Sequence, residues 1–173
     1  MRSISFNQAM LAAVRAGRKT VTRRRLPTSL PMQQEPARYR FISLSDRGAL
    51  FEDYHAQPPA LLPLVPLPFG PVGTHLIVAE DPGLVLKIVG LRAEQVRDLT
   101  EEDAAAEGIY ARPEPGPPYW GGVESDAAHP GAFHWYGSPI AAFQGLLDSI
   151  YPTAWARNEW VWVIEFAKLP AAE

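Results

Sequence analysis

The sequence predicts an α+β fold in which about five to seven mostly antiparallel strands form a barrel-like sheet, with a few helices packed outside it. Three observations support this prediction. Short β-branched and apolar runs recur without the alternation of strand and helix that is typical of parallel sheets. Helical periodicity is confined to three segments. The run Trp160–Phe166 is apolar on nearly both faces, which indicates a central strand.

The chain opens with a short strand followed by a helix. Ile4 and Phe6 indicate the strand, and Asn7 is a suitable N-cap for a helix that runs to about Ala16. Gly17 can adopt the left-handed conformation that ends such a helix. We expect this helix, spanning residues 7–16, to pack on the outside of the sheet.

A second strand and a hairpin follow. Residues 20–24 are rich in β-branched side chains and predict a strand. Residues 26–37 are interpreted as a loop. The runs 40–44 and 49–53 flank the turn sequence SDRG at 45–48, a pattern typical of a β-hairpin.

The middle of the chain combines a proline-rich run with a strand pair. Residues 58–71 hold six prolines among apolar side chains. This run is either an extended ligand for a proline-recognition module or an ordered connector lying on the core, and we favour the connector. The runs 74–80 and 84–89 are separated by Pro82 and Gly83 and predict a pair of strands.

Two helices and an insertion precede the final strand. In residues 99–108, Thr100 is a helix N-cap, Asp103 stands at the capping-box position, and Gly108 ends the helix. Residues 111–137 are rich in Pro and Gly and form an insertion loop whose aromatic side chains either stack on bases or pin the loop to the domain. We favour the second reading. Residues 138–150 predict an outer helix.

Length and composition limit the classes of function. A chain of 173 residues is expected to form one domain, here residues 1–169. The absence of cysteine excludes disulfides and thiolate catalysis, and the four histidines lack metal-binding spacing. We therefore expect neither a metal nor another cofactor. No signal-peptide run and no apolar stretch of ~18 residues occurs, so a soluble, cytoplasmic protein without a membrane partner is expected. The oligomeric state is not indicated.

Basic residues are concentrated near the N-terminus. Residues 1–40 carry nine Arg and Lys and one acid, whereas residues 41–173 carry seven basic and eighteen acidic residues. Six of the basic residues lie between 15 and 25, together with two threonines. Fixed cations beside hydroxyl groups suit a phosphate backbone or a polar nucleotide. The alternative is a solvated surface or a set of internal salt bridges, and we favour a positive groove.

Four blocks of the sequence together resemble the ASCH domain family, which has a PUA-like β-barrel fold. The helix running into AGRKTVTRR at 16–24 is similar to the first family motif, and GTHLIVAE at 73–80 resembles a later strand. The acidic helix LTEEDAAAEG at 99–108 and the closing strand WVWVIEF at 160–166 also match. The resemblance implies that the protein binds RNA or a modified nucleoside. Longer family members with such insertions resemble phage or prophage proteins.

The resemblance also implies site residues. One branch of the family hydrolyses the amide of N(4)-acetylcytidine, and its motif falls on Lys19, Thr22 and Glu107 as candidate catalytic residues; since no metal site is visible in the sequence, such a hydrolase would be metal-independent here. Thr22 would attack or orient water, Glu107 would act as base, and Lys19 would activate the nucleophile or hold the oxyanion. Lys19 and Thr22 have opposite parity on an ideal strand, so their convergence requires Lys19 to lie in the turn after Gly17.

The binding function implied by the resemblance is our leading hypothesis, with RNA or a nucleotide held between the basic strand and the acidic helix. The candidate ligand-binding residues are Arg18, Arg23, Arg24 and Glu80. In the block 73–80 the family's usual acid, tryptophan and arginine are replaced by Thr74, Ile77 and Ala79. The alternatives are the N(4)-acylcytidine amidohydrolase, a ribonuclease, and a non-enzymatic interaction domain using the proline-rich run.

Overall fold

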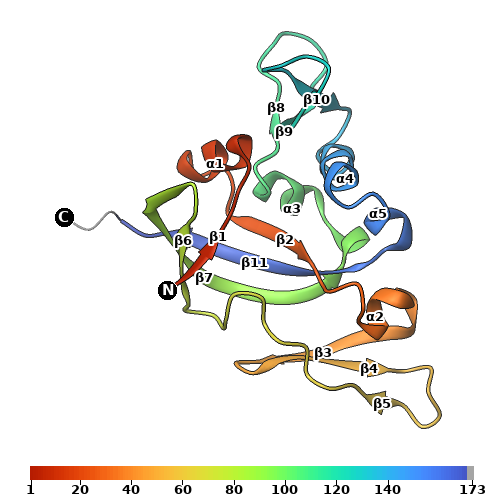
Figure 1. The fold of residues 1–173 in the computed structure, drawn as a ribbon. Coiled ribbons are helices and arrows are strands. Elements are labelled where there is room, and N and C mark those ends of the chain that lie inside the picture. Colours follow the sequence, from red (N-terminus) through yellow and green to blue (C-terminus); the bar gives the residue numbers. More distant parts are fainter. Residues whose placement is uncertain (171–173) are drawn as a thin grey trace.

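The computed structural model describes residues 1–170 and has a mixed α+β fold rich in strands, as the sequence predicts (Figure 1). Its main sheet has five strands in the order β1–β6–β7–β11–β2 and curls into a half-barrel. All neighbouring pairs are antiparallel except β1 and β6, which are parallel. The strands are β1 (Arg2–Ile4), β2 (Val21–Arg25), β6 (His75–Val78), β7 (Asp81–Gln95) and β11 (Trp160–Lys168).

Strand β11 is central, which confirms the prediction from its apolar sequence. It pairs with β7 on one side and with β2 on the other. Side chains of a strand alternate between the two faces of a sheet, and here both faces are covered. Trp160, Trp162 and Ile164 belong to one hydrophobic core, whereas Val161 and Val163 belong to a second. A strand buried on both faces needs apolar residues at every position.

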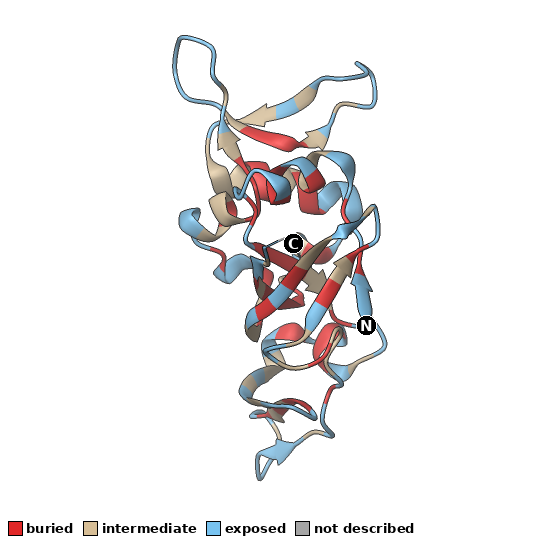
Figure 2. Cartoon of the chain, turned by 90° about the vertical axis from the view of Figure 1, so that its left-hand side faces the viewer, coloured by how far each residue is buried: buried red, intermediate tan, exposed pale blue. Residues whose placement is uncertain are grey.

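The two cores lie on opposite faces of the main sheet. Figure 2 shows many of the buried residues in the middle of the molecule, around this sheet. The first core includes residues of β1, β6 and β7, of the strand β4 (Gly48–Asp53) and of the helix α1 (Gln8–Arg15). The second is formed with α3 (Glu101–Ala106) and α4 (Pro139–Ile150). Strand β2 therefore faces the core that contains α1 on one side and the core that contains α3 and α4 on the other. The candidate site lies beside this strand.

The three helices expected from the sequence are confirmed together with their caps. The Asn7 side chain accepts a hydrogen bond from the Met10 amide at the start of α1. Thr100 and Asp103 form a capping box on α3. Ser138 accepts from the Ala141 amide at the start of α4. Each cap satisfies an amide that the first helical turn leaves without a backbone partner.

The prediction that residues 26–37 form a loop is wrong in part. This segment contains the helix α2 (Pro31–Gln34), followed by the 3₁₀ turn η1 (Pro36–Arg38). The Gln33 side chain is buried and bonds to the Leu26 carbonyl and to both the amide and the carbonyl of Trp160. This tertiary anchoring, which local sequence does not reveal, holds the short helix against β11. Two further short helical elements are η2 (Val96–Asp98) and α5 (Ala154–Arg157).

Two small sheets flank the main one (Figure 1). The expected hairpin is confirmed as β3 (Tyr39–Ser45) and β4 (Gly48–Asp53), with β5 (Ala60–Leu61) added to its edge. The proline-rich run lies on the core as an ordered connector, because Val65 is buried and bridges to Ala49. Helices within residues 1–170 are all too short or too polar to cross a membrane.

The interpretation of residues 111–137 as a loop is also wrong in part. The segment forms most of a three-stranded sheet of β8 (Tyr110–Ala111), β9 (Trp120–Ser125) and β10 (Phe133–Tyr136). Trp120 and Tyr136 pack against the second core, so these aromatic residues pin the insertion to the domain. Backbone pairing between segments separated by loops overrides the high content of Pro and Gly.

Candidate functional site

A cavity of about 240 Å³ lies beside β2, between the segment that follows β1 and the helix α4. One wall comes from residues 5–7 and Met10, and the opposite wall is the apolar side of α4. Thr22, Arg23, Arg24 and Glu107 contribute the charged and hydroxyl groups of the lining. The cavity therefore lies beside the basic strand and against α4, and the acidic helix α3 reaches it only through Glu107, the residue that caps its C-terminal end.

Lys19 and Glu107 form a buried ion pair at this site. The Lys19 Nζ lies 2.6 Å from the Glu107 Oε2, and the two side chains are 0% and 3% exposed. The same ammonium donates to the carbonyls of Val21, at 2.9 Å, and Glu107, at 3.2 Å. All three donors of the ammonium thus have an acceptor. Burial lowers the pKa of Lys19 from its ordinary value, and the Glu107 carboxylate opposes that shift.

Lys19 lies just after the turn at residues 16 and 17 rather than in it, and before β2 begins. Helix α1 ends at Arg15, Gly17 has a φ of 77°, and Lys19 makes an isolated bridge with Glu107 before β2 begins at Val21. Its side chain therefore does not follow the alternation of the strand. Lys19 is not among the residues that line the cavity, whereas Glu107 and Thr22 are. A ligand in the cavity would contact Glu107 and Thr22, with Lys19 acting behind Glu107.

Arg23 is held by three carboxylates. Its guanidinium lies 3.2 Å from Glu107 Oε1, 2.7 Å from Glu94 Oε1 and 3.3 Å from Asp103 Oδ2. The Arg23 side chain is 1% exposed. The predicted role of Arg23 as a surface cation for a polyanion therefore does not fit its position, because its charge is compensated inside the protein.

Arg24 lies at the other side of the cavity and contacts no carboxylate within ion-pair distance among residues 1–170. Its guanidinium donates to the Ser5 carbonyl at 2.6 Å and lies 5.9 Å from the centre of the Phe6 ring. This bond joins β2 to the segment that follows β1. Among the candidate residues that line the cavity, Arg24 is thus the one whose positive charge is left for a ligand.

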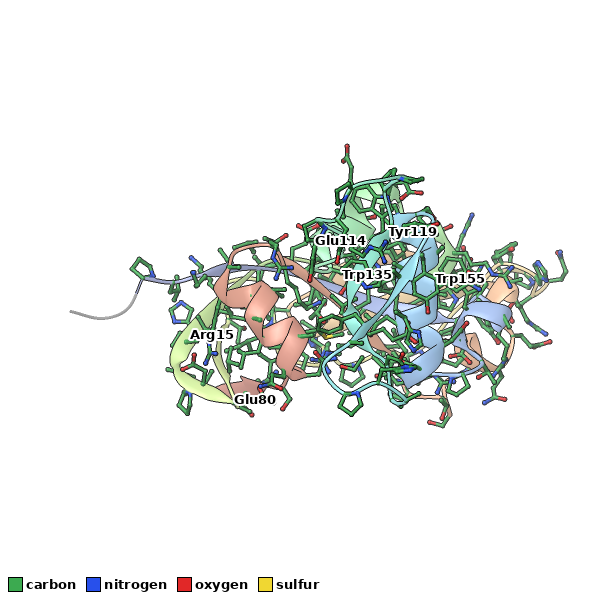
Figure 3. The ribbon with its side chains drawn as sticks, turned by 90° about the horizontal axis from the view of Figure 1, so that it is seen from above. Arg15, Glu80, Glu114, Tyr119, Trp135 and Trp155 are labelled. Atoms are coloured by element: carbon green, nitrogen blue, oxygen red, sulfur yellow. The ribbon has the colours of Figure 1, made fainter. Side chains whose placement is uncertain are left out.

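Glu80 and Arg18 lie outside the cavity. Glu80 accepts bonds from the Ser5 hydroxyl at 2.6 Å and from the Phe6 amide at 3.1 Å, which hold the pKa of its carboxyl below the ordinary value. It therefore fixes the wall of the cavity from behind; in Figure 3 it lies at the end of the molecule beside Arg15. Arg18 is exposed, donates to the Gly108 carbonyl and stacks on Tyr110.

The sequence did not identify Glu94, Asp103 as an Arg23 partner, or the apolar wall of α4. Asp103 was recognised only for its capping role, which it also performs. Glu94 reaches Arg23 across the intervening strand β11, so finding it requires the strand order. The wall on α4 consists of Phe143, Leu146, Leu147 and Ile150, which read in the sequence as an ordinary core-facing stripe.

The arrangement offers an acid–base group beside a hydroxyl in a largely apolar enclosure. Glu107 can accept a proton from a water in the cavity, and the ammonium of Lys19 fixes the carboxylate that does so. Residues 1–170 contain no group of three or more His, Asp or Glu side chains placed to hold a metal ion. No known family model, curated protein or solved structure matches the chain.

Proposed function

We propose that the protein is a PUA-like domain of the ASCH type that binds one nucleoside or nucleotide in the cavity beside β2. The observation that carries the proposal is the enclosure itself, in which Phe6 and Phe143 stand on opposite walls with Thr22, Arg24 and Glu107 between them. Apolar walls with a few polar groups are the usual design of a small-molecule site. Pockets for drug-sized ligands occupy roughly 300–1,000 Å³, so about 240 Å³ suits a single base or nucleoside.

The small number of unpaired basic side chains at the cavity also favours a single base over a bound strand of nucleic acid. Of the basic residues between 15 and 25, Lys19 and Arg23 are buried and paired with carboxylates. Few cations therefore remain to contact successive phosphates, each of which needs its own cation. RNA would have to present one unstacked base to the cavity, a common mode of RNA recognition.

The amidohydrolase is the second candidate, and the contact between Lys19 and Glu107 beside Thr22 favours it. Glu107 would take a proton from water as the water oxygen attacks the acyl carbon of an N(4)-acylcytidine. Return of that proton to the departing nitrogen breaks the C–N bond and releases a carboxylic acid and cytidine. Lys19 would keep Glu107 oriented, and Thr22 would position the water or the acyl oxygen.

Calorimetric titration with cytidine, uridine and N(4)-acetylcytidine tests the binding proposal. We expect saturable binding that weakens when Phe143→Ala removes one wall, and no change in Arg18→Ala, whose side chain lies outside the cavity. The absence of binding by all three nucleosides would refute the proposal.

Acetate release from N(4)-acetylcytidine tests the hydrolase separately. Glu107→Gln keeps the shape of the side chain and removes the base, so kcat should fall by at least ~100-fold, the usual size of a general-base contribution. Thr22→Val should also be nearly inactive. Binding of N(4)-acetylcytidine without turnover would leave the binding function and remove the enzyme.

A further inference from the structure

The outer edge of β2 carries unpaired peptide groups, and the register of the sheet shows which ones. Phe166 N–H donates to the Thr20 carbonyl, and Leu26 N–H donates to the Trp160 carbonyl. Between these points Thr22 pairs with Ile164 and Arg24 with Trp162. Antiparallel pairs alternate between bonded and non-bonded positions. Even-numbered residues of β2 therefore bond to β11, and the N–H and C=O of Val21, Arg23 and Arg25 point the other way.

The contacts of Lys19 show which way the unpaired peptide groups of this edge point. Its ammonium donates to the Val21 carbonyl and to Glu107 together, so the odd-numbered edge faces the cavity side of the strand. The next peptide groups along the edge are the N–H and C=O of Arg23. Residues 1–170 supply neither of them with a backbone or side-chain partner. Both groups of one residue point in the same direction, which gives a donor and an acceptor side by side.

The cavity spans this edge rather than one face of the sheet. Thr22 and Arg24 lie on the face of the first core, where Phe6 and Met10 form the wall. Arg23 lies on the opposite face, with its guanidinium 5.9 Å from the centre of the Phe143 ring. All three consecutive residues nevertheless line the cavity. The Arg23 peptide therefore lies between two apolar walls, where a flat ring would present its edge to the strand.

Two unpaired side-chain donors also indicate that a ligand with hydrogen-bond acceptors binds at this edge. The Nε atoms of Arg23 and Arg24 are buried and have no hydrogen-bond partner in the part of the chain that the structure describes. Arg23 is 1% exposed as a side chain, so its orphaned N–H cannot simply turn to bulk water. Buried donors are paired in most native sites, by protein, water or ligand. Ligand acceptors beside the ring edge would satisfy them.

We propose that the cavity recognises a pyrimidine of the uracil type, whose ring N–H stands beside a ring carbonyl, and that this cyclic-amide edge exchanges two hydrogen bonds with the N–H and C=O of Arg23; cytosine, whose N3 carries no hydrogen, is not read in this way. The ring N–H donates to the Arg23 carbonyl, and the ring carbonyl accepts from the Arg23 amide. A further oxygen of the ligand accepts from the Nε of Arg24. The inference rests on the proposed nucleoside site and specifies the chemical edge that is read there.

Methylation of the ring nitrogen tests the edge without altering the protein. We expect 3-methyluridine to bind about 5- to 150-fold more weakly than uridine, because the Arg23 carbonyl loses its donor in a buried site. The free bases uracil and 1,3-dimethyluracil form a second pair that needs no sugar. Equal affinities within both pairs would overturn the proposal.

Nuclear magnetic resonance of the ¹⁵N-labelled protein provides the direct observation. On addition of uridine or uracil, the Arg23 amide should shift and gain protection from hydrogen exchange. The Arg25 amide is the internal control, since it lies on the same edge but outside the cavity. Equal changes at both amides would indicate pairing along the whole edge, as by an added peptide strand, and would overturn the pyrimidine proposal.

The outcomes separate this inference from the proposed function. If nucleosides bind with an affinity that ring methylation does not change, and the Arg23 amide resonance does not shift, the proposed contact with the Arg23 peptide is refuted but the nucleoside site is retained. If uracil shifts the Arg23 amide resonance but no nucleoside binds, the contact with the Arg23 peptide is supported and the proposed nucleoside-binding function is refuted. Arg24→Lys, which keeps the charge and loses Nε, should weaken uridine roughly 5-fold or more. Arg18→Lys is the matched control outside the cavity and should not.

Discussion

The buried pair of Lys19 and Glu107 makes the sharpest prediction about stability. Glu107→Gln removes one charge of a pair whose side chains are 0% and 3% exposed. At an effective dielectric constant of ~20, two charges 2.6 Å apart attract by about 6 kcal/mol. Desolvation of the two ions offsets much of this attraction in the intact protein. In the variant, however, Lys19 keeps its desolvation cost and loses its partner, so we expect a loss of about 3–5 kcal/mol.

Urea and thermal unfolding followed by tryptophan fluorescence measure this loss. For a chain of this size each kcal/mol lowers Tm by about 2–4 °C, so Glu107→Gln should unfold roughly 6–20 °C earlier. Lys19→Met should also be strongly destabilising, because it leaves Glu107 buried with only Arg23. The double variant should lose much less than the sum of the single losses, since neither charge then remains unpaired.

Asp81→Asn is the matched control. It breaks the pair between Arg15 and Asp81, whose side chains are 55% and 31% exposed. Exposed pairs contribute about 0–1 kcal/mol, so this variant should unfold like the parent. If Glu107→Gln cost no more than Asp81→Asn, or if the Lys19 and Glu107 losses simply added, the reasoning from a desolvated pair would be refuted.

Three further predictions concern the rest of the fold. Thr100→Ala removes the cap of α3 and should cost about 0.5–2 kcal/mol in urea unfolding; an unchanged midpoint would contradict the cap. Phe51→Ala empties a fully buried position against Trp160, 5.1 Å away between ring centres, and should cost about 3–5 kcal/mol. Burial and the Glu124 carboxylate raise the pKa of Tyr136 to about 12. Because the folded protein holds that proton more tightly than the unfolded chain, stability should fall as pH rises from 10 towards 12, and Tyr136→Phe should flatten this part of the curve in unfolding at fixed pH.

Local sequence predicted those parts of the fold that local forces determine. Caps such as Asn7 and Thr100 act within one turn, and the helices they start are where the sequence indicates. The run Trp160–Phe166 identified the central strand because it is apolar on nearly both faces, and burial on both faces leaves a signal in almost every residue. Helix α2 depends on the contacts of Gln33 with Trp160, which is distant in sequence, and no local pattern announces it.

For the candidate site, too, the sequence predicted some residues and missed those that depend on long-range contacts. The motif predicted Lys19, Thr22 and Glu107 as site residues; the structure brings Lys19 and Glu107 into contact, and Thr22 and Glu107 line the same cavity. The partners of Arg23 were missed because they depend on strand order, which places β7 two strands away from β2. The state of a basic residue, paired inside the protein or free for a ligand, is decided by such long-range contacts. Composition alone suggested a positive groove that the pairing of Arg23 does not support.

The basic cluster near the N-terminus instead satisfies groups inside the protein. The half-barrel has two edges, β1 and β2, and the gap between them is crossed by Arg24, which donates to the Ser5 carbonyl. Lys19 donates to the Val21 carbonyl on the open edge of β2. Cationic side chains thus replace some of the ladder bonds that a closed barrel would have, and they protect the edge from pairing with another chain. The Arg23 peptide is the part of this edge that remains open, and it opens onto the cavity. A ligand held there meets one uncompensated cation, so a neutral or singly charged base fits the site better than a polyanion.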